Sequence, residues 1–161
     1  MKRVLFLLTT LLIGGLMLSG CKKDNPTPEP EPEPTPTTTR VVYMVSNTIS
    51  GKVMSSCFRL NVTYNDANGQ EVTENGVTLP WTKVVEVSSS FHAKMTGEIV
   101  YNEEELPETV IFGKPHGIGY YNGESLVIEI AGGLTTGNKN KFLEMMSEDP
   151  NRLQFTEEKD F

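Results

Sequence analysis

The residues of this chain best suited to chemistry are two histidines and two cysteines: His92, His116, Cys21 and Cys57. Neither histidine forms an i, i+4 pair or joins a Cys/His cluster with the spacing of metal ligands. His92 falls on the outward side of an alternating pattern, and His116 is predicted to lie in a loop between a proline and a glycine. We therefore predict no enzymatic activity, no catalytic residue, no metal site and no cofactor.

Three polar motifs have both a chemical and a structural interpretation. Glu103-Glu104-Glu105 predicts a solvated loop, because a catalytic carboxylate pair needs two groups opposed across a cleft. Asp66-Ala67-Asn68-Gly69 begins like a calcium loop but lacks the later ligands, which favours a hairpin turn. The run from Gly113 to Gly119 contains a proline and precedes no helix, so we predict a turn and not a phosphate cradle.

The aromatic residues Trp81, Tyr120 and Tyr121 are the candidates for a sugar-stacking platform. Adjacent strand residues point to opposite faces, so at most one of the two tyrosines faces outward. Trp81 follows a proline and is predicted to start a strand and fill the core. Tyr120 and Tyr121 remain the candidate binding-surface residues.

The chain begins with a leader that ends at Cys21. Lys2 and Arg3 precede an apolar run from Val4 to Leu18, which is shorter than the roughly 20 residues of a spanning helix. This order is typical of a secretory signal peptide, here residues 1–20. The ending Leu18-Ser19-Gly20-Cys21 resembles the lipobox of bacterial lipoproteins. That resemblance implies that Cys21 becomes the first mature residue and carries acyl chains such as palmitate, which anchor the protein to a membrane. An uncleaved anchor helix is the alternative.

The mature start Lys22-Lys23-Asp24 is similar to that of lipoproteins of the Bacteroidota. The similarity implies the outer membrane. In that group, acidic residues just after the cysteine favour export to the cell surface, and only Asp24 lies close here. The periplasmic face and the cell surface therefore both stay open.

Residues 21–39 are predicted to form a lipidated stalk. Every second residue from Pro26 to Pro36 is proline, which supplies no N–H for a helix or a sheet. Such a segment is extended at about 3.1 Å per residue and holds the following domain about 40 Å from the bilayer.

Residues 40–161 are long enough for one hydrophobic core. Removal of the leader leaves 12 basic and 21 acidic residues, a net charge of −9. This acidic balance argues against binding to nucleic acid or to anionic lipid. Cys57 is then the one cysteine of the domain. We predict a buried side chain, with an intermolecular disulfide or a reactive thiol as alternatives.

Alternation of apolar and polar residues dominates this domain and predicts half-buried strands. The inward residues are Val41, Tyr43 and Val45, then Phe58, Leu60, Val62 and Tyr64, then Phe91, Ala93, Met95, Ile99 and Tyr101 with a bulge at Gly97, and finally Leu126, Ile128 and Ile130. Turns are predicted at Asn68-Gly69, Asn75-Gly76 and Asn122-Gly123. A single helix is predicted from Lys139 to Ser147, capped by Asn138 and ending before Pro150. The predicted fold is an all-β immunoglobulin- or transthyretin-like β-sandwich with one short C-terminal helix.

Part of this domain resembles the soluble domain of the MmpS family, accessory proteins of RND-type lipid and siderophore exporters. The matching segments are Val42-Tyr43, Val62-Thr63-Tyr64 with Asp66 and Gly69, and Leu79-Pro80-Trp81-Thr82-Lys83. The resemblance implies a β-sandwich and a partner in an envelope transport machine. That family carries an N-terminal membrane helix and typically a disulfide, and this chain departs from it in both respects.

From these observations we predict a lipid-anchored envelope protein that acts by protein–protein interaction, as an accessory to a transport or assembly complex. The alternative is a glycan- or ligand-binding module at the cell surface. A contiguous exposed apolar patch would favour the first function. A groove with solvent-facing aromatic residues would favour the second.

Overall fold

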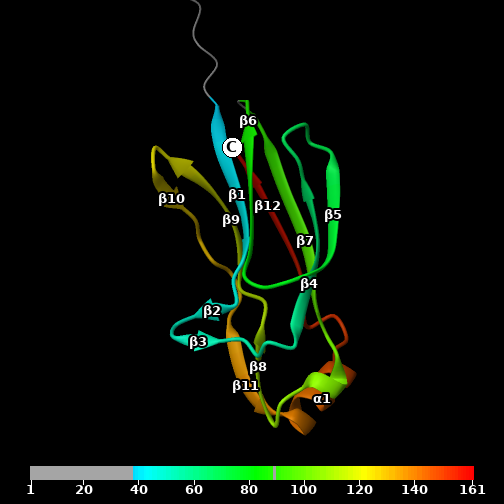
Figure 1. Ribbon diagram of the computed structural model, residues 1–161. Helices are drawn as coiled ribbons and strands as arrows, with labels where there is room; N and C mark the ends of the chain where they lie inside the picture. The colour runs from blue at the N-terminus through cyan, green and yellow to red at the C-terminus, as the bar shows by residue number, and fades with distance from the viewer. Residues whose placement is uncertain (1–37, 89) are drawn as a thin grey trace, which may run out of the picture. The chain divides into compact units, whose positions relative to one another are not determined.

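The computed structural model describes residues 38–88 and 90–161, so the leader, Cys21 and the stalk up to residue 37 lie outside the described residues. Thr39, the last residue of the predicted stalk, already belongs to the first strand. The described chain forms two four-stranded antiparallel sheets that pack face to face, with one short helix (Figure 1). The predicted all-β sandwich with one short helix is confirmed.

The first sheet, called the β1 sheet, has the order β10-β9-β1-β6. It is made of β1 (Thr39–Val45), β6 (Trp81–Val87), β9 (His116–Asn122) and β10 (Ser125–Val127). The second, called the β4 sheet, has the order β12-β7-β4-β5. It is made of β4 (Phe58–Asn65), β5 (Glu71–Val77), β7 (His92–Tyr101) and β12 (Gln154–Asp160).

The core lies between the sheets and follows the predicted alternation. Every second residue of β4 is buried, namely Phe58, Leu60, Val62 and Tyr64. The inward residues of β1 and β7 join them in one apolar cluster. The rings of Tyr43 and Tyr64 face each other across the sheets at a centroid distance of 5.4 Å.

Two glycines behave differently from the prediction. Gly97 is no bulge, because it pairs in regular register with Val62 and Phe155. A side chain at Gly97 would occupy the place of the Phe155 ring, which explains why glycine stands there. The irregularity instead lies between β4 and β5, where Gly76 has a φ of +65° inside β5. The predicted Asn75-Gly76 turn is therefore wrong, whereas Gly69 and Gly123 do lie in turns.

The last predicted strand is only partly correct. β10 ends at Val127, and residues 128–130 lie outside the described strands. These residues lie against β9 at Gly117 and Gly119, which have no side chains. A Cβ atom at Gly117 would collide with the carbonyl group of Glu129, and a Cβ atom at Gly119 would collide with Ile128. We call residues 128–130 the strap, because they pack on the bare backbone of β9.

The end of the sandwich is closed by smaller elements. β2 (Thr48–Ile49) pairs with β3 (Lys52–Val53), and β8 (Thr109–Gly113) pairs with β11 (Leu134–Asn138). α1 (Lys139–Glu148) follows β11, and the Asn138 side chain caps it by accepting a hydrogen bond from the Lys141 backbone N–H at 2.8 Å. Phe142 of this helix is fully buried among the rings of Phe58, Tyr101 and Phe112. α1 lies at the opposite end of the sandwich from the start of β1 (Figure 1).

Candidate functional site

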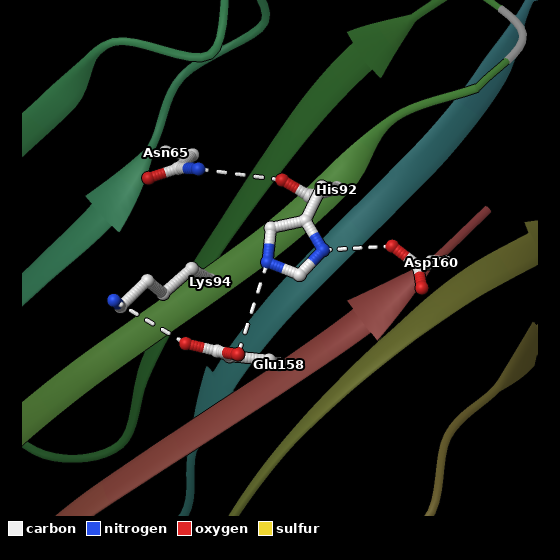
Figure 2. Close-up of polar contacts among 5 residues, drawn as sticks. All are labelled: Asn65, His92, Lys94, Glu158 and Asp160. Carbon is white, nitrogen blue, oxygen red and sulfur yellow. Dashed lines mark hydrogen bonds and ion pairs between the residues drawn. The ribbon is translucent and has the colours of Figure 1, made fainter.

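The outer face of the β4 sheet carries a cluster of charged side chains around His92, shown in Figure 2. His92 Nδ1 lies 2.7 Å from Asp160 Oδ1, and Nε2 lies 3.9 Å from Glu158 Oε2. Lys94 Nζ lies 3.3 Å from Glu158 Oε1, and the Asn65 amide donates to the His92 carbonyl oxygen. The His92 side chain is 54% exposed, which confirms that it points outward.

This arrangement ties β12 to β7. The two carboxylates approach different ring nitrogens of His92, so they flank the ring and do not converge with it on a cation (Figure 2). Within residues 38–88 and 90–161, no group of three acidic, histidine or cysteine side chains is placed to hold a metal ion. Exposed ion pairs of this kind contribute only about 0–1 kcal/mol each to stability.

Next to this cluster, four threonines form a row across the whole β4 sheet. Thr63 pairs with Thr73 on one side and with Thr96 on the other, and Thr96 pairs with Thr156. Their side chains point outward, since each alternates with an inward residue. The Thr63 and Thr73 hydroxyl groups lie 2.8 Å apart and share a hydrogen bond.

A second polar row runs beside the threonines. Glu98 pairs with Asn61 and with Gln154, and the Gln154 amide donates to Glu98 Oε1 at 3.3 Å. The two rows line an open groove of about 490 Å³, the lining residues coming from all four strands of the sheet. The groove could not be predicted from the sequence, because cross-strand register cannot be derived from one strand at a time.

His116, predicted in a loop, is instead the buried first residue of β9, so that prediction is wrong. Its ring stacks on Phe155 at 4.2 Å between centroids. Its Nδ1 lies 2.6 Å from the Lys114 carbonyl oxygen, and Nε2 lies 3.3 Å from Glu157 Oε2. Both ring nitrogens therefore face an acceptor oxygen. The contact between His116 and Glu157 joins β9 of one sheet to β12 of the other.

At the edge of the sandwich formed by β5 and β6, the Glu74 side chain of β5 reaches the aromatic core. Its carboxylate accepts hydrogen bonds from the Trp81 indole N–H at 3.0 Å, the Tyr64 hydroxyl at 3.1 Å and the Lys83 ammonium at 3.3 Å. These donors, the Trp81 bond first, hold the pKa of Glu74 below its ordinary value of 4.5. Glu74 therefore joins the β5 and β6 edges, and Trp81 is buried as predicted.

The middle of the outer face of the β1 sheet is apolar and is flanked by exposed Arg40, Thr82 and Glu86. Val42 is fully buried although it does not belong to the core cluster, because it lies on the other side of β1. Its neighbours in register are Val84 and Gly119, and Ile128 of the strap lies over Gly119. Met44 follows on the same face. We call Val42, Met44, Val84 and Ile128 the apolar face; Val84 is 44% exposed.

The candidate tyrosines lie on opposite sides of β9. Tyr120 packs against Phe161 at a centroid distance of 5.8 Å, and the Arg40 guanidinium lies 4.4 Å from the centre of the Tyr121 ring. Both are half-buried, and neither lies beside Trp81 in the core. The structure therefore does not bring the three predicted aromatic residues together on one surface.

The other candidate residues, Cys57, Glu103 to Glu105 and Asp66, lie where the structural interpretation of each one predicts. Cys57 is buried, and this burial raises the pKa of its thiol, which disfavours the reactive thiolate. Glu103–Glu105 forms an exposed 3-10 turn capped by Asn102. Asp66 lies in the β4–β5 hairpin turn, where the backbone N–H groups of Gln70 and Asn68 donate to its carboxylate and lower its pKa.

No protein-family description matches the chain, and no curated protein sequence is significantly similar to it. Among the described residues, no helix has the length and apolar character needed to cross a membrane.

Proposed function

We propose that this protein is a lipid-anchored component of the bacterial outer membrane that acts by binding another envelope protein through its apolar face. The observation that carries the proposal is the contrast between the two outer faces of the sandwich. The β4 sheet presents charged and hydroxyl-bearing side chains to solvent. The middle of the β1 sheet instead presents exposed Val84 with half-buried Met44 and Ile128 over a buried Val42, although Arg40, Thr82 and Glu86 flank them. Contiguous apolar patches on the surface of a folded domain mark protein-binding sites.

The class of partner follows from the leader and from the resemblance to the MmpS family. A lipidated Cys21 and a proline-rich stalk would hold the domain close to other envelope proteins. The resemblance of residues 42–87 to accessory proteins of exporters supports a component of a transport or assembly complex as the partner. The apolar face would dock on a complementary apolar surface of that component.

Photo-crosslinking in intact cells tests this proposal. A photoreactive amino acid replaces Thr82, which is exposed and lies next to Val84 on the same face. We expect one defined envelope component to be captured from this position and not from Thr156 on the other sheet. Val84→Glu should then abolish its capture, because it places a charge in the contact.

The control is Val53→Glu, which changes another exposed valine, 53% accessible, on the β2–β3 hairpin. It should leave capture unchanged. Equal capture from both faces, or capture that survives Val84→Glu, would contradict a docking role for the apolar face.

A further inference from the structure

The groove on the outer face of the β4 sheet is a second candidate binding site, separate from the apolar face. Its polar lining comprises four hydroxyl groups, three amides and one carboxylate, from Thr63, Thr73, Thr96, Thr156, Asn61, Asn75, Gln154 and Glu98. No lysine or arginine lines it. We propose that this groove binds a neutral oligosaccharide that lies across the four strands.

The chemistry of the lining favours a polyhydroxylated ligand. Threonine hydroxyls and the side-chain amides of Asn and Gln both donate and accept hydrogen bonds, as sugar hydroxyl groups do. A site lined with such groups distinguishes well between ligands, because a ligand without matching hydroxyls leaves the polar groups of the site unpaired. The carboxylate of Glu98 adds a stronger acceptor in the middle of the second row.

The charge of the surroundings selects against anionic ligands. The mature chain carries a net charge of −9, and the lining has one carboxylate and no cation. A phosphate, a sulfated sugar or a uronic acid polymer would therefore meet repulsion. A neutral sugar chain experiences none.

The groove is also held in shape before any ligand arrives. The hydrogen bonds between Thr63 and Thr73 and between Gln154 and Glu98 join neighbouring strands, and Asn61 accepts a bond from the Gly76 backbone N–H at 2.9 Å. Side chains fixed on strands lose little freedom when a ligand binds, which favours affinity. Because the lining spans β5, β4, β7 and β12, the ligand it fits is elongated.

Titration followed by NMR tests the proposal on the processed chain carrying Cys21→Ala, which stays in solution. The probes are neutral oligosaccharides of glucose, mannose, galactose and N-acetylglucosamine, with hexagalacturonate as the anionic probe. Concentrations up to about 10 mM saturate a site with a Kd of about 1 mM. We expect at least one neutral probe to shift the amide signals of Thr63, Thr96 and Thr156, and hexagalacturonate to leave them unchanged.

A pair of matched variants identifies the groove as the site. Thr96→Val keeps the branched shape of the side chain and removes its hydroxyl, so it should weaken binding about 3- to 10-fold. Thr82→Val makes the same change on the outer face of the β1 sheet and should leave binding unchanged. No shift with any neutral probe, stronger binding of hexagalacturonate, or equal effects of the two variants would overturn the proposal. This test is independent of whether the apolar face captures a protein.

Discussion

At the scale of single residues, Glu74 shows how one carboxylate joins two strand edges. It is one of the few acidic side chains of this domain that turns inward, and three donors from β4 and β6 meet it there. Hydrogen bonds to a charged acceptor contribute more than neutral ones, about 1.5–3 kcal/mol each at most. The side chain is 29% exposed, so solvent weakens these bonds only in part.

We predict that Glu74→Gln lowers the free energy of unfolding by about 1–2 kcal/mol at pH 7. The pKa of Glu74 is lowered in the folded protein, so the stabilisation by the carboxylate is present above the ordinary pKa of 4.5. It is lost as the pH falls through the lowered pKa, and the difference from Glu74→Gln then shrinks. Urea unfolding followed by Trp81 fluorescence at pH 7 and pH 3 measures both differences.

The control for this prediction is Glu71→Gln, on the exposed start of the same strand. It should change stability little at either pH. A difference between Glu74→Gln and the unchanged protein that stays constant from pH 7 to pH 3 would show that the ionised carboxylate is not the cause.

At the scale of elements, the strap depends on Gly117 and Gly119, which leave the first half of β9 without outward side chains. Ile128 lies over Gly119, which is the neighbour in register of the fully buried Val42. The apolar face therefore combines a strand surface with a segment that is not a strand. The alternation of Ile128 with Leu126 and Ile130 matches the strand period and predicts a regular strand, which the structure does not have there.

We predict that Gly119→Ala displaces the strap and destabilises the domain by about 1–3 kcal/mol, the cost typical of an overpacked site. A methyl group at this position would collide with the Val127 carbonyl oxygen and with Ile128. Gly133→Ala is the matched control, since a Cβ there meets nothing within 4 Å. Thermal or urea unfolding compares the two variants, and equal stability would mean that the strap moves aside at no cost.

The elements also show what local sequence patterns can and cannot predict. The strands around Phe58–Tyr64 and the cap of α1 at Asn138 depend on nearby residues, and both predictions are confirmed. The burial of His116 depends on Phe155 and Glu157, which are distant in sequence and reach it only through sheet packing. The threonine row needs three correct registers at once. Neither could be found from spacing along the chain.

At the scale of the whole molecule, the two outer faces of the sandwich differ in chemistry. One carries ion pairs, hydroxyls and a polar groove, and the other carries the apolar face. An exposed apolar patch favours a protein-binding function, and a groove with outward aromatic residues favours glycan binding. The groove found here is lined by hydroxyls and amides, so the glycan hypothesis now depends on hydrogen bonding and not on stacking.

The anchor can be tested by one substitution, Cys21→Ala, which removes the sulfur that the lipobox resemblance predicts to be acylated. Two or more acyl chains anchor a protein stably, because each buried CH₂ contributes about 0.8 kcal/mol. We expect the variant to lose lipid labelling and to leave the membrane fraction, while its domain stays folded. Metabolic labelling with a palmitate analogue, fractionation and the fluorescence of buried Trp81 measure these three properties. Tight membrane association that persists in Cys21→Ala would instead indicate that the apolar run from Val4 to Leu18 remains as an uncleaved anchor, and the domain would then not carry a lipid at its stalk.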